Sequence, residues 1–584
     1  MTRQLSHTIS TNKHTTKTKS FDYYELNYYE SLKNELQKFN FVEKLKDINQ
    51  LGATKVQKNK VKSRYDYVIF QLYIHNEIQI NVDSHYLEFA YSNQVKEFEF
   101  KNANLQFATI PTIADCIQIL ILAYNIGHFS NTFTSSLALT ESANGNANIK
   151  NWLISSLDSY DKTIANSIID DMDYTRFHLI NSLIILNKCD DIDSVKLAKE
   201  LIRAYIIGTD SKKINYIFKI FRKVRSLCYI TFDLPISNNL ISFSVHNKNS
   251  VTSFLKEYFS AFNNDQNLYS LFSSVNKILE DEIYDSSENA LCLYKISRKI
   301  KKSIKELDIN TTSYFDLLSS SQSIVNRNYS KRIDFDKTNI LHITFCETDN
   351  VDVFKLHKRL SKMNNVRTSF YIKYRFKNNQ RLKYYTFIVA LSKKCVDKTY
   401  ISFKVLKTFI SILYNKISLS DSRYISITKF FLHYLLDGKE LIIDYTINDD
   451  HCIIVKKGVK SQEKLLDKYI RESNSSADAI HETDFIKTVI SKNKINSTAM
   501  IVFGSIKTLK KGSSKSSRIN EYDGIIIYPF TDIVIFTEAK NMSKGNDAKK
   551  DLDRKLNNIG IKYNKEDLIK ENHDCYFKYI IKKQ

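Results

Sequence analysis

The residues from Asn520 to Asn541, NEYDGIIIYPFTDIVIFTEAKN, carry the clearest fold signal in the chain. Two apolar runs, residues 522–528 and 532–537, are rich in β-branched residues, and a proline stands between them where strand pairing must stop. These features predict two β-strands joined as a hairpin. Because the turn lies midway between Asp523 and Glu538, folding would place their carboxylates opposite each other on neighbouring strands.

The end of this hairpin concentrates charge in an apolar setting. Glu538 and Lys540 are two residues apart, so an extended backbone presents both on one face while Ala539 points into the core. Two carboxylates and an amine are costly to place there unless a cation compensates them. Mg²⁺ prefers hard oxygen ligands and is usually held by one or two carboxylates together with substrate phosphates. We therefore expect Asp523 and Glu538 to hold Mg²⁺ or Mn²⁺, with Lys540 positioning a water or offsetting charge, which is chemistry suited to phosphodiester hydrolysis.

The order of these residues also resembles a known family. Asp523, a hydrophobic strand and then Glu538-Ala539-Lys540 resemble the D…(D/E)-x-K core of the PD-(D/E)XK nuclease superfamily, which includes restriction endonucleases. The resemblance implies a restriction-endonuclease-like α/β domain, here residues 461–584. In that superfamily a helix before the hairpin often supplies another acid.

The segment ADAIHETDFIKTVISK, residues 477–492, has the apolar spacing of such a helix. Glu482 is the candidate acid and Asp484 the second choice. The alternative is an ordinary solvated hairpin, because E-x-K is a common sequence and short motifs match by chance.

Length and composition bound the remaining choices. A chain of 584 residues predicts two to four domains. The 86 Lys and Arg residues against 64 Asp and Glu residues give a net charge of +22, which favours a nucleic-acid partner, DNA above RNA, although a lysine-rich surface alone would give the same charge. The 8 cysteines lack metal-binding spacing and indicate reduced thiols in a cytoplasmic protein, and no apolar run is long enough to cross a membrane.

The apolar pattern divides the chain into four parts. Residues 1–20 are polar and basic and predict a flexible arm. Residues 21–320 show mostly helical spacing, with helices expected at 163–186, 251–262 and 268–283 among others.

Residues 332–459 mix predicted strands, residues 400–403 among them, with predicted helices. The nuclease-like domain follows, and its basic, Gly/Ser-rich segment 507–518 is expected to be a loop. Within the mixed block, residues 367–387 alternate basic and aromatic side chains, as in a nucleic-acid surface or, our preferred reading, a hairpin with its aromatic side chains in the core.

The helical part contains a second resemblance. Four segments, KLKDINQLG at residues 44–52, SRYDY at 63–67, AYNIGHF at 123–129 and IDDMDY at 169–174, resemble in order the motifs of HD-domain dNTP phosphohydrolases. The resemblance implies an HD-like helical domain. The alternative is a generic helical bundle.

The departures from that family's pattern indicate a degenerate domain. Tyr67 stands where the family has a ligand histidine, Tyr124 and Asn125 replace its His-Asp pair, and only Asp170 of the ligand set remains. One carboxylate does not fix a catalytic transition metal. We therefore expect a scaffold, an oligomerisation surface or a nucleotide sensor without phosphohydrolase activity, with His128 structural.

Together these features predict a multidomain protein, namely a metal-dependent nuclease regulated by a degenerate HD-like domain. A homo-oligomer, a nucleotide effector and a role in antiphage defence are further expectations. Two alternatives are open: a non-catalytic nucleic-acid-binding or assembly protein, and a nucleotide phosphohydrolase acting through the helical domain.

Overall fold

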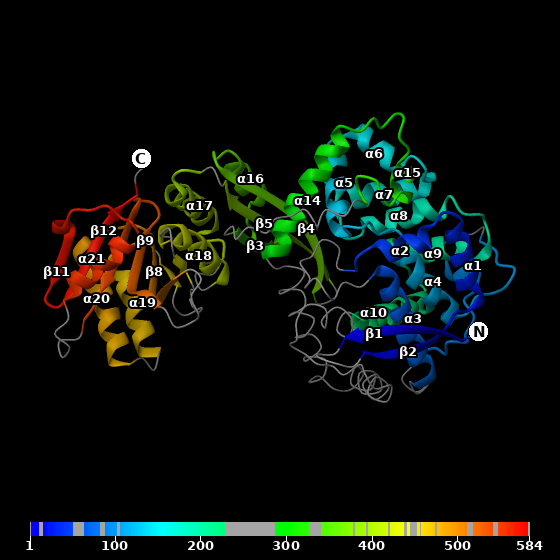
Figure 1. Ribbon diagram of the computed structural model, residues 1–584, viewed down its shortest axis with the longest axis horizontal. Coiled ribbons are helices and arrows are strands. Elements are labelled where there is room, and N and C mark those ends of the chain that lie inside the picture. The colour runs from blue at the N-terminus through cyan, green and yellow to red at the C-terminus, as the bar shows by residue number, and fades with distance from the viewer. Residues whose placement is uncertain are drawn as a thin grey trace. The chain divides into compact units, whose positions relative to one another are not determined.

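A computed structural model of the chain describes residues 2–10, 16–50, 63–81, 88–101, 105–228, 287–326, 340–377, 380–392, 395–417, 421–436, 441–443, 452–455, 457–472, 476–510, 518–540 and 547–581. The chain forms two compact units (Figure 1). The first comprises Met1–Phe335 with Tyr371–Tyr374, and the second comprises Asp336–Phe370 with Arg375–Gln584.

The first unit is helical, as expected. Its elements are β1 (Thr2–Ser10), β2 (Thr16–Tyr24), α1 (Asn27–Lys38), α2 (Phe41–Asp47), α3 (Arg64–Asn81), η2 (Glu97–Glu99), α4 (Ile113–Ile126), α5 (Phe133–Ala143), α6 (Ala147–Ile154), α7 (Ser159–Asp170), α8 (Phe177–Leu186), α9 (Asp193–Ile207), α10 (Lys212–Cys228), α14 (Ser287–Lys305) and α15 (Tyr314–Ser319). None of the helices in the described ranges is both long and apolar enough to cross a membrane.

Helix α4 lies at the centre of this unit. Nearly all its side chains are buried, and it packs against α1, α3, α8, α9 and α10. A helix that is apolar on every side has to be covered on every side. Its start is fixed by a capping box, in which the Thr112 side chain accepts from the Asp115 N–H and the Asp115 carboxylate accepts from the Thr112 N–H.

The first unit departs from expectation at two places. Residues 2–10 and 16–24 pair as antiparallel strands β1 and β2, where we expected a flexible arm over residues 1–20. Threonine and isoleucine in this segment favour extended backbone, which a search for apolar periodicity overlooks. The helix expected over residues 163–186 is interrupted between α7 and α8, where Met172 has a φ of 54°. The helices expected at 251–262 and 268–283 lie outside the described residues.

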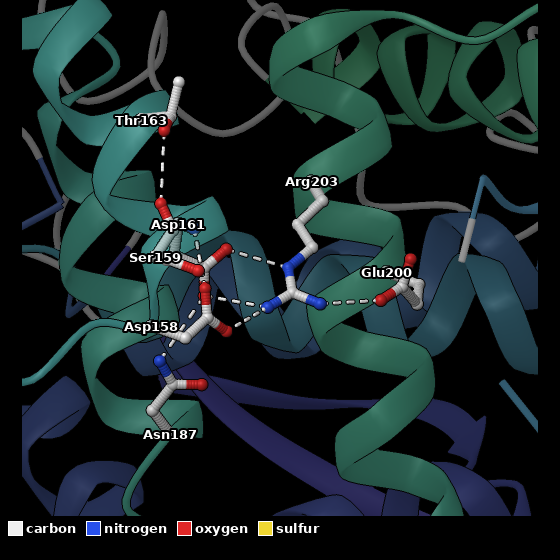
Figure 2. A network of polar contacts seen from close by, with 7 residues as sticks. All are labelled: Asp158, Ser159, Asp161, Thr163, Asn187, Glu200 and Arg203. Atoms are coloured by element: carbon white, nitrogen blue, oxygen red, sulfur yellow. Dashed lines mark hydrogen bonds and ion pairs between the residues drawn. The ribbon is translucent and has the colours of Figure 1, made fainter. Parts of the chain in front are cut away.

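An ion-pair network joins α7 to α9 (Figure 2). Arg203 of α9 donates from Nε to Asp161 Oδ1 at 2.8 Å and from Nη2 to Asp158 Oδ2 at 2.7 Å. Its Nη1 donates to Glu200 Oε1 at 2.8 Å. Asp158 also caps α7 by accepting from the Asp161 N–H. Because Asp161 is fully buried, Arg203 is the cation that makes its burial tolerable.

The second unit combines sheets and helices. Its elements are β3 (Ile340–Cys346), η6 (Glu347–Asp349), α16 (Val353–Ser361), β4 (Val366–Lys377), β5 (Gln380–Leu391), α17 (Lys398–Leu413), α18 (Ser422–Leu436), β6 (Leu441–Ile443), β7 (Cys452–Val455), α19 (Val459–Glu472), α20 (Ala477–Asn493), β8 (Ala499–Lys510), β9 (Arg518–Tyr528), β10 (Ile533–Glu538), α21 (Ala548–Asn558), η9 (Lys565–Asp567), β11 (Leu568–Glu571) and β12 (Asp574–Ile580).

A seven-stranded sheet organises this unit. Its strand order is β11-β12-β10-β9-β8-β6, and β7 also pairs with β8. A separate three-stranded sheet has the order β3-β5-β4. The hairpin β9–β10 sends alternate side chains into two cores, because Ile525 and Phe536 pack with α21 whereas Ile526 and Ile535 pack with α20.

Three details of the second unit differ from expectation. Residues 400–403, expected as a strand, belong to α17, because the buried stripe Phe403, Leu406 and Phe409 continues with helical spacing. Strands β6 and β7 join the large sheet, so the expected boundary near residue 460 falls inside one compact unit. The basic segment 507–518, expected as a loop, begins in β8, and residues 511–517 lie outside the described residues.

Candidate active site

The hairpin register brings the two predicted carboxylates together. Strands β9 and β10 pair antiparallel from Ile533 opposite Tyr528 to Thr537 opposite Gly524. The next position in this register sets Asp523 opposite Glu538, as the sequence predicts. Asp523 Oδ2 then accepts a hydrogen bond from the Ala539 N–H at 2.8 Å, which ties the two strand ends together.

Glu538 is the most enclosed member of the site. It is fully buried at the end of β10, yet two amines reach it. Lys540 Nζ lies 2.8 Å from its Oε1, and Lys555 Nζ of α21 contacts its Oε2. Lys540 Nζ is also 3.2 Å from Asp551 Oδ2, likewise on α21. Lys540 therefore shares its charge between two carboxylates.

Electrostatics in the site oppose further negative charge. Burial, and after it the carboxylate of Glu538, raises the pKa of Asp523, while Lys555 and Lys540 act against this rise. Burial would lower the pKa of Lys540, but its interactions with the carboxylates of Glu538 and Asp551 raise the pKa overall. The site thus favours cations near its carboxylates.

Helix α20 supplies the third predicted carboxylate. Burial, and then the negative charges of Asp523 and Glu538, raises the pKa of Glu482 to about 7. Glu482 is therefore close enough to the pair to feel their charge. Asp484, the second choice, is exposed and its Oδ1 lies 3.3 Å from Lys487 Nζ. Positions two residues apart on a helix are rotated by roughly 200° from each other, so Asp484 faces a different direction from Glu482.

A glycine allows α20 to approach the hairpin. A Cβ atom at Gly524 would lie 2.6 Å from Thr537 Oγ1 and 2.7 Å from Ile486 Cδ1. Real Cβ atoms do not tolerate such contacts. The absence of a side chain at this position is what lets α20 pack on β9 at the level of the carboxylates.

Sequence reasoning missed three residues of the site, Lys555, Asp551 and Asp574. Lys555 and Asp551 come from α21, where their four-residue spacing places them on one helix face. Asp574, at the start of β12, accepts from the Lys540 N–H at 2.9 Å and lies 3.2 Å from His481 Nε2. The i, i+4 pair on α21 was a readable signal, whereas nothing in the local pattern marks Asp574.

The donor set fits a cation that brings part of its own coordination shell. Within the described ranges, no group of three or more His, Cys, Asp or Glu side chains is arranged to hold a metal ion. Asp523 and Glu538 would supply two hard oxygen ligands, and Mg²⁺ bound to phosphate substrates commonly has only one or two carboxylates from the protein. The fit is that of a two-carboxylate site completed by water and substrate.

Only some of the residues in the four segments that resemble HD-domain motifs contact one another in the helical unit. Arg64 Nη1 donates to Asn125 Oδ1 at 3.4 Å, so the second and third motifs are in contact. Asp170 is largely exposed, and its carboxylate accepts from Lys150 Nζ at 2.7 Å. His128 stacks on the buried His178 at 4.1 Å, and burial keeps the pKa of both well below the usual histidine value. Tyr67 is buried and Tyr124 stacks edge-on against His178.

Comparisons with protein-family models, with curated proteins and with solved structures found no match to this chain.

Proposed function

We propose that this protein is a metal-dependent nuclease that hydrolyses phosphodiester bonds of nucleic acid, with DNA the favoured substrate. The observation that carries the proposal is the convergence of Asp523 and Glu538 at one hairpin end, with Lys540 Nζ 2.8 Å from Glu538. The net charge of +22 supports a polyanionic substrate.

Each side chain has a role in the proposed reaction. Asp523 and Glu538 would hold Mg²⁺ or Mn²⁺, which lowers the pKa of a bound water and stabilises charge on the phosphate. Lys540 orients the attacking water or offsets the charge that develops on the phosphate. Glu482, whose pKa of about 7 lies near neutrality, is suited to accept a proton at the edge of the site.

The proposal extends to regulation by the helical unit. A degenerate HD-like unit would control cleavage as a scaffold, through homo-oligomerisation or by binding a nucleotide effector, and antiphage defence is the proposed context. The departures at Tyr67, Tyr124 and Asn125 support a regulatory over a hydrolytic role.

Cleavage of plasmid, single-stranded DNA and single-stranded RNA tests the function. We expect the wild type to cut at least one substrate with Mg²⁺ or Mn²⁺, and Glu538→Ala and Lys540→Ala to lose roughly 100-fold or more in rate. A chelator should stop the reaction. Cleavage that survives both substitutions would refute the assignment of the site.

A second candidate is a non-catalytic nucleic-acid-binding or assembly protein. The observation that favours it is that both oxygens of Glu538 contact lysines, so the hairpin is compensated without a metal. This candidate predicts nucleic-acid binding that is unchanged by a chelator and no product from any of the three substrates.

A further inference from the structure

Lys555 is an unusual partner for a carboxylate at a proposed metal site. Its side chain is only 7% exposed, and Nζ contacts Oε2 of the fully buried Glu538. The Tyr522 ring covers the amine at 5.9 Å, and the Tyr522 hydroxyl donates to the Lys555 carbonyl at 3.2 Å. Lysine is seldom this buried unless it is paired, so the contact with Glu538 is what allows Lys555 to be buried in the core.

Lys540 sits differently on the other oxygen of the same carboxylate. Its side chain is 24% exposed, and it lies 2.8 Å from Glu538 Oε1 and 3.2 Å from Asp551 Oδ2. Asp551 therefore offers Lys540 a second acceptor within reach. Among the ion pairs of the described residues, Lys555 has Glu538 as its carboxylate partner, with no such second acceptor.

We propose that Lys555 is the fixed counter-ion of Glu538 and a positioning residue of the site, whereas Lys540 is exchangeable. Lys555 holds Oε2, which leaves Oε1 as the oxygen available to a divalent cation. Lys540 yields Oε1 to the cation and pairs with Asp551 instead. This inference rests on the proposed metal site and deepens it by assigning how its charges are exchanged.

Opposite effects on metal binding follow for the two helix residues. Lys555→Gln removes a positive charge beside the carboxylates, so a divalent cation is repelled less and should bind more tightly. Asp551→Asn removes the negative charge that would receive Lys540, so Lys540 stays on Glu538 and the cation should bind more weakly. A merely structural role for α21 would weaken binding in both variants.

The test is Mn²⁺ binding to the full chain without nucleic acid, measured from the electron paramagnetic resonance signal of free Mn²⁺. We expect Lys555→Gln to tighten the dissociation constant about tenfold and Asp551→Asn to weaken it about tenfold. Lys555→Arg keeps the charge and should bind as the wild type does. Lys550→Gln, an exposed lysine on the same helix, is the matched control and should leave binding unchanged.

Several results would overturn the inference. These are Lys555→Gln binding equal to or weaker than the wild type, no Mn²⁺ binding by the wild type, or Glu538→Gln binding as tightly as the wild type. If circular dichroism shows that Lys555→Gln does not fold, Mn²⁺ binding by Asp551→Asn becomes the test. Unchanged or tighter binding by Asp551→Asn would contradict the proposal that Lys540 moves from Glu538 to Asp551.

Cleavage assays on the same proteins separate this inference from the proposed function. A wild type that binds Mn²⁺ with the expected order of affinities but cuts no nucleic acid would refute the nuclease and support the assignment of Lys555. If the wild type does cleave, Lys555→Gln should lower kcat although it binds the metal more tightly. Lys555→Arg should have the kcat of the wild type.

Discussion

Gly524 shows how one residue can control the geometry of the whole site. A methyl group there would clash with Thr537 Oγ1 and Ile486 Cδ1, so in Gly524→Ala these two side chains must shift or α20 must move away from the hairpin. We expect a loss of about 1 to 3 kcal/mol in the free energy of unfolding. Chemical denaturation of the full chain, monitored through the unfolding transition of the second unit, measures this loss of stability.

A double substitution checks the cause of that loss. Ile486→Val removes the Cδ1 atom, so adding it to Gly524→Ala should recover part of the lost stability. If the two effects simply add, the contact between α20 and β9 is not the reason that this position is glycine.

His75 makes a prediction about acid stability. It is completely buried in α3, neither ring nitrogen has a hydrogen-bond partner among the described residues, and burial lowers its pKa to about 3. In the unfolded chain His75 would bind a proton near pH 6.5, whereas in the folded chain it stays neutral down to about pH 3. The free energy of unfolding is therefore at its full value above pH 6.5 and falls as the pH drops toward 3.

This histidine should cost roughly 2 kcal/mol of stability between pH 7 and pH 5. His75→Phe keeps an aromatic ring at this position and removes the titration, so the unfolding temperature of the first unit should depend less on pH in that range. Calorimetry at the two pH values measures the difference. An unchanged pH dependence in the variant would mean that His75 is solvated or paired in solution.

At the scale of elements, the contact between α7 and α9 depends on Arg203. Arg203→Met would leave the buried Asp161 without its cation, so we expect a loss of about 3 kcal/mol or more from the first unit. Lys196→Met on the same helix is the control, because Lys196 pairs with Asp193 at 3.8 Å and Asp191 at 4.0 Å near the surface. This control should cost under about 1 kcal/mol. If thermal unfolding shows the same loss of stability in both variants, the Arg203 network contributes no more than a surface ion pair does.

The elements also show how far the sequence alone could go. The hairpin and its register follow from two β-branched runs about a proline, and helix α20 follows from apolar spacing, so the sequence alone predicts that Asp523, Glu538 and Lys540 lie together. Lys555 and Asp574 come from elements that follow in the chain, and their place depends on how α21 and β12 pack on β10. Tertiary packing of that kind leaves no periodic signal.

At the scale of the molecule, the expectation of a helical first half and sheets in the second is confirmed. The boundary expected near residue 460 lies inside the second unit, where β6 and β7 join the sheet that contains the hairpin. Strand pairing between distant segments overrides a division based on composition. The proposed division of labour, regulation by the first unit and cleavage by the second, stays a prediction.

The decisive measurement is plasmid cleavage by the full chain with Mg²⁺, wild type beside Asp523→Asn. Asp523→Asn keeps the shape of the side chain and its hydrogen-bonding capacity toward the Ala539 N–H, but removes the charge that would hold the cation. The proposed site predicts that the wild type cuts the plasmid and that the variant is slower by about 100-fold or more. Equal rates for the two proteins would contradict the assignment of the hairpin carboxylates as the catalytic centre.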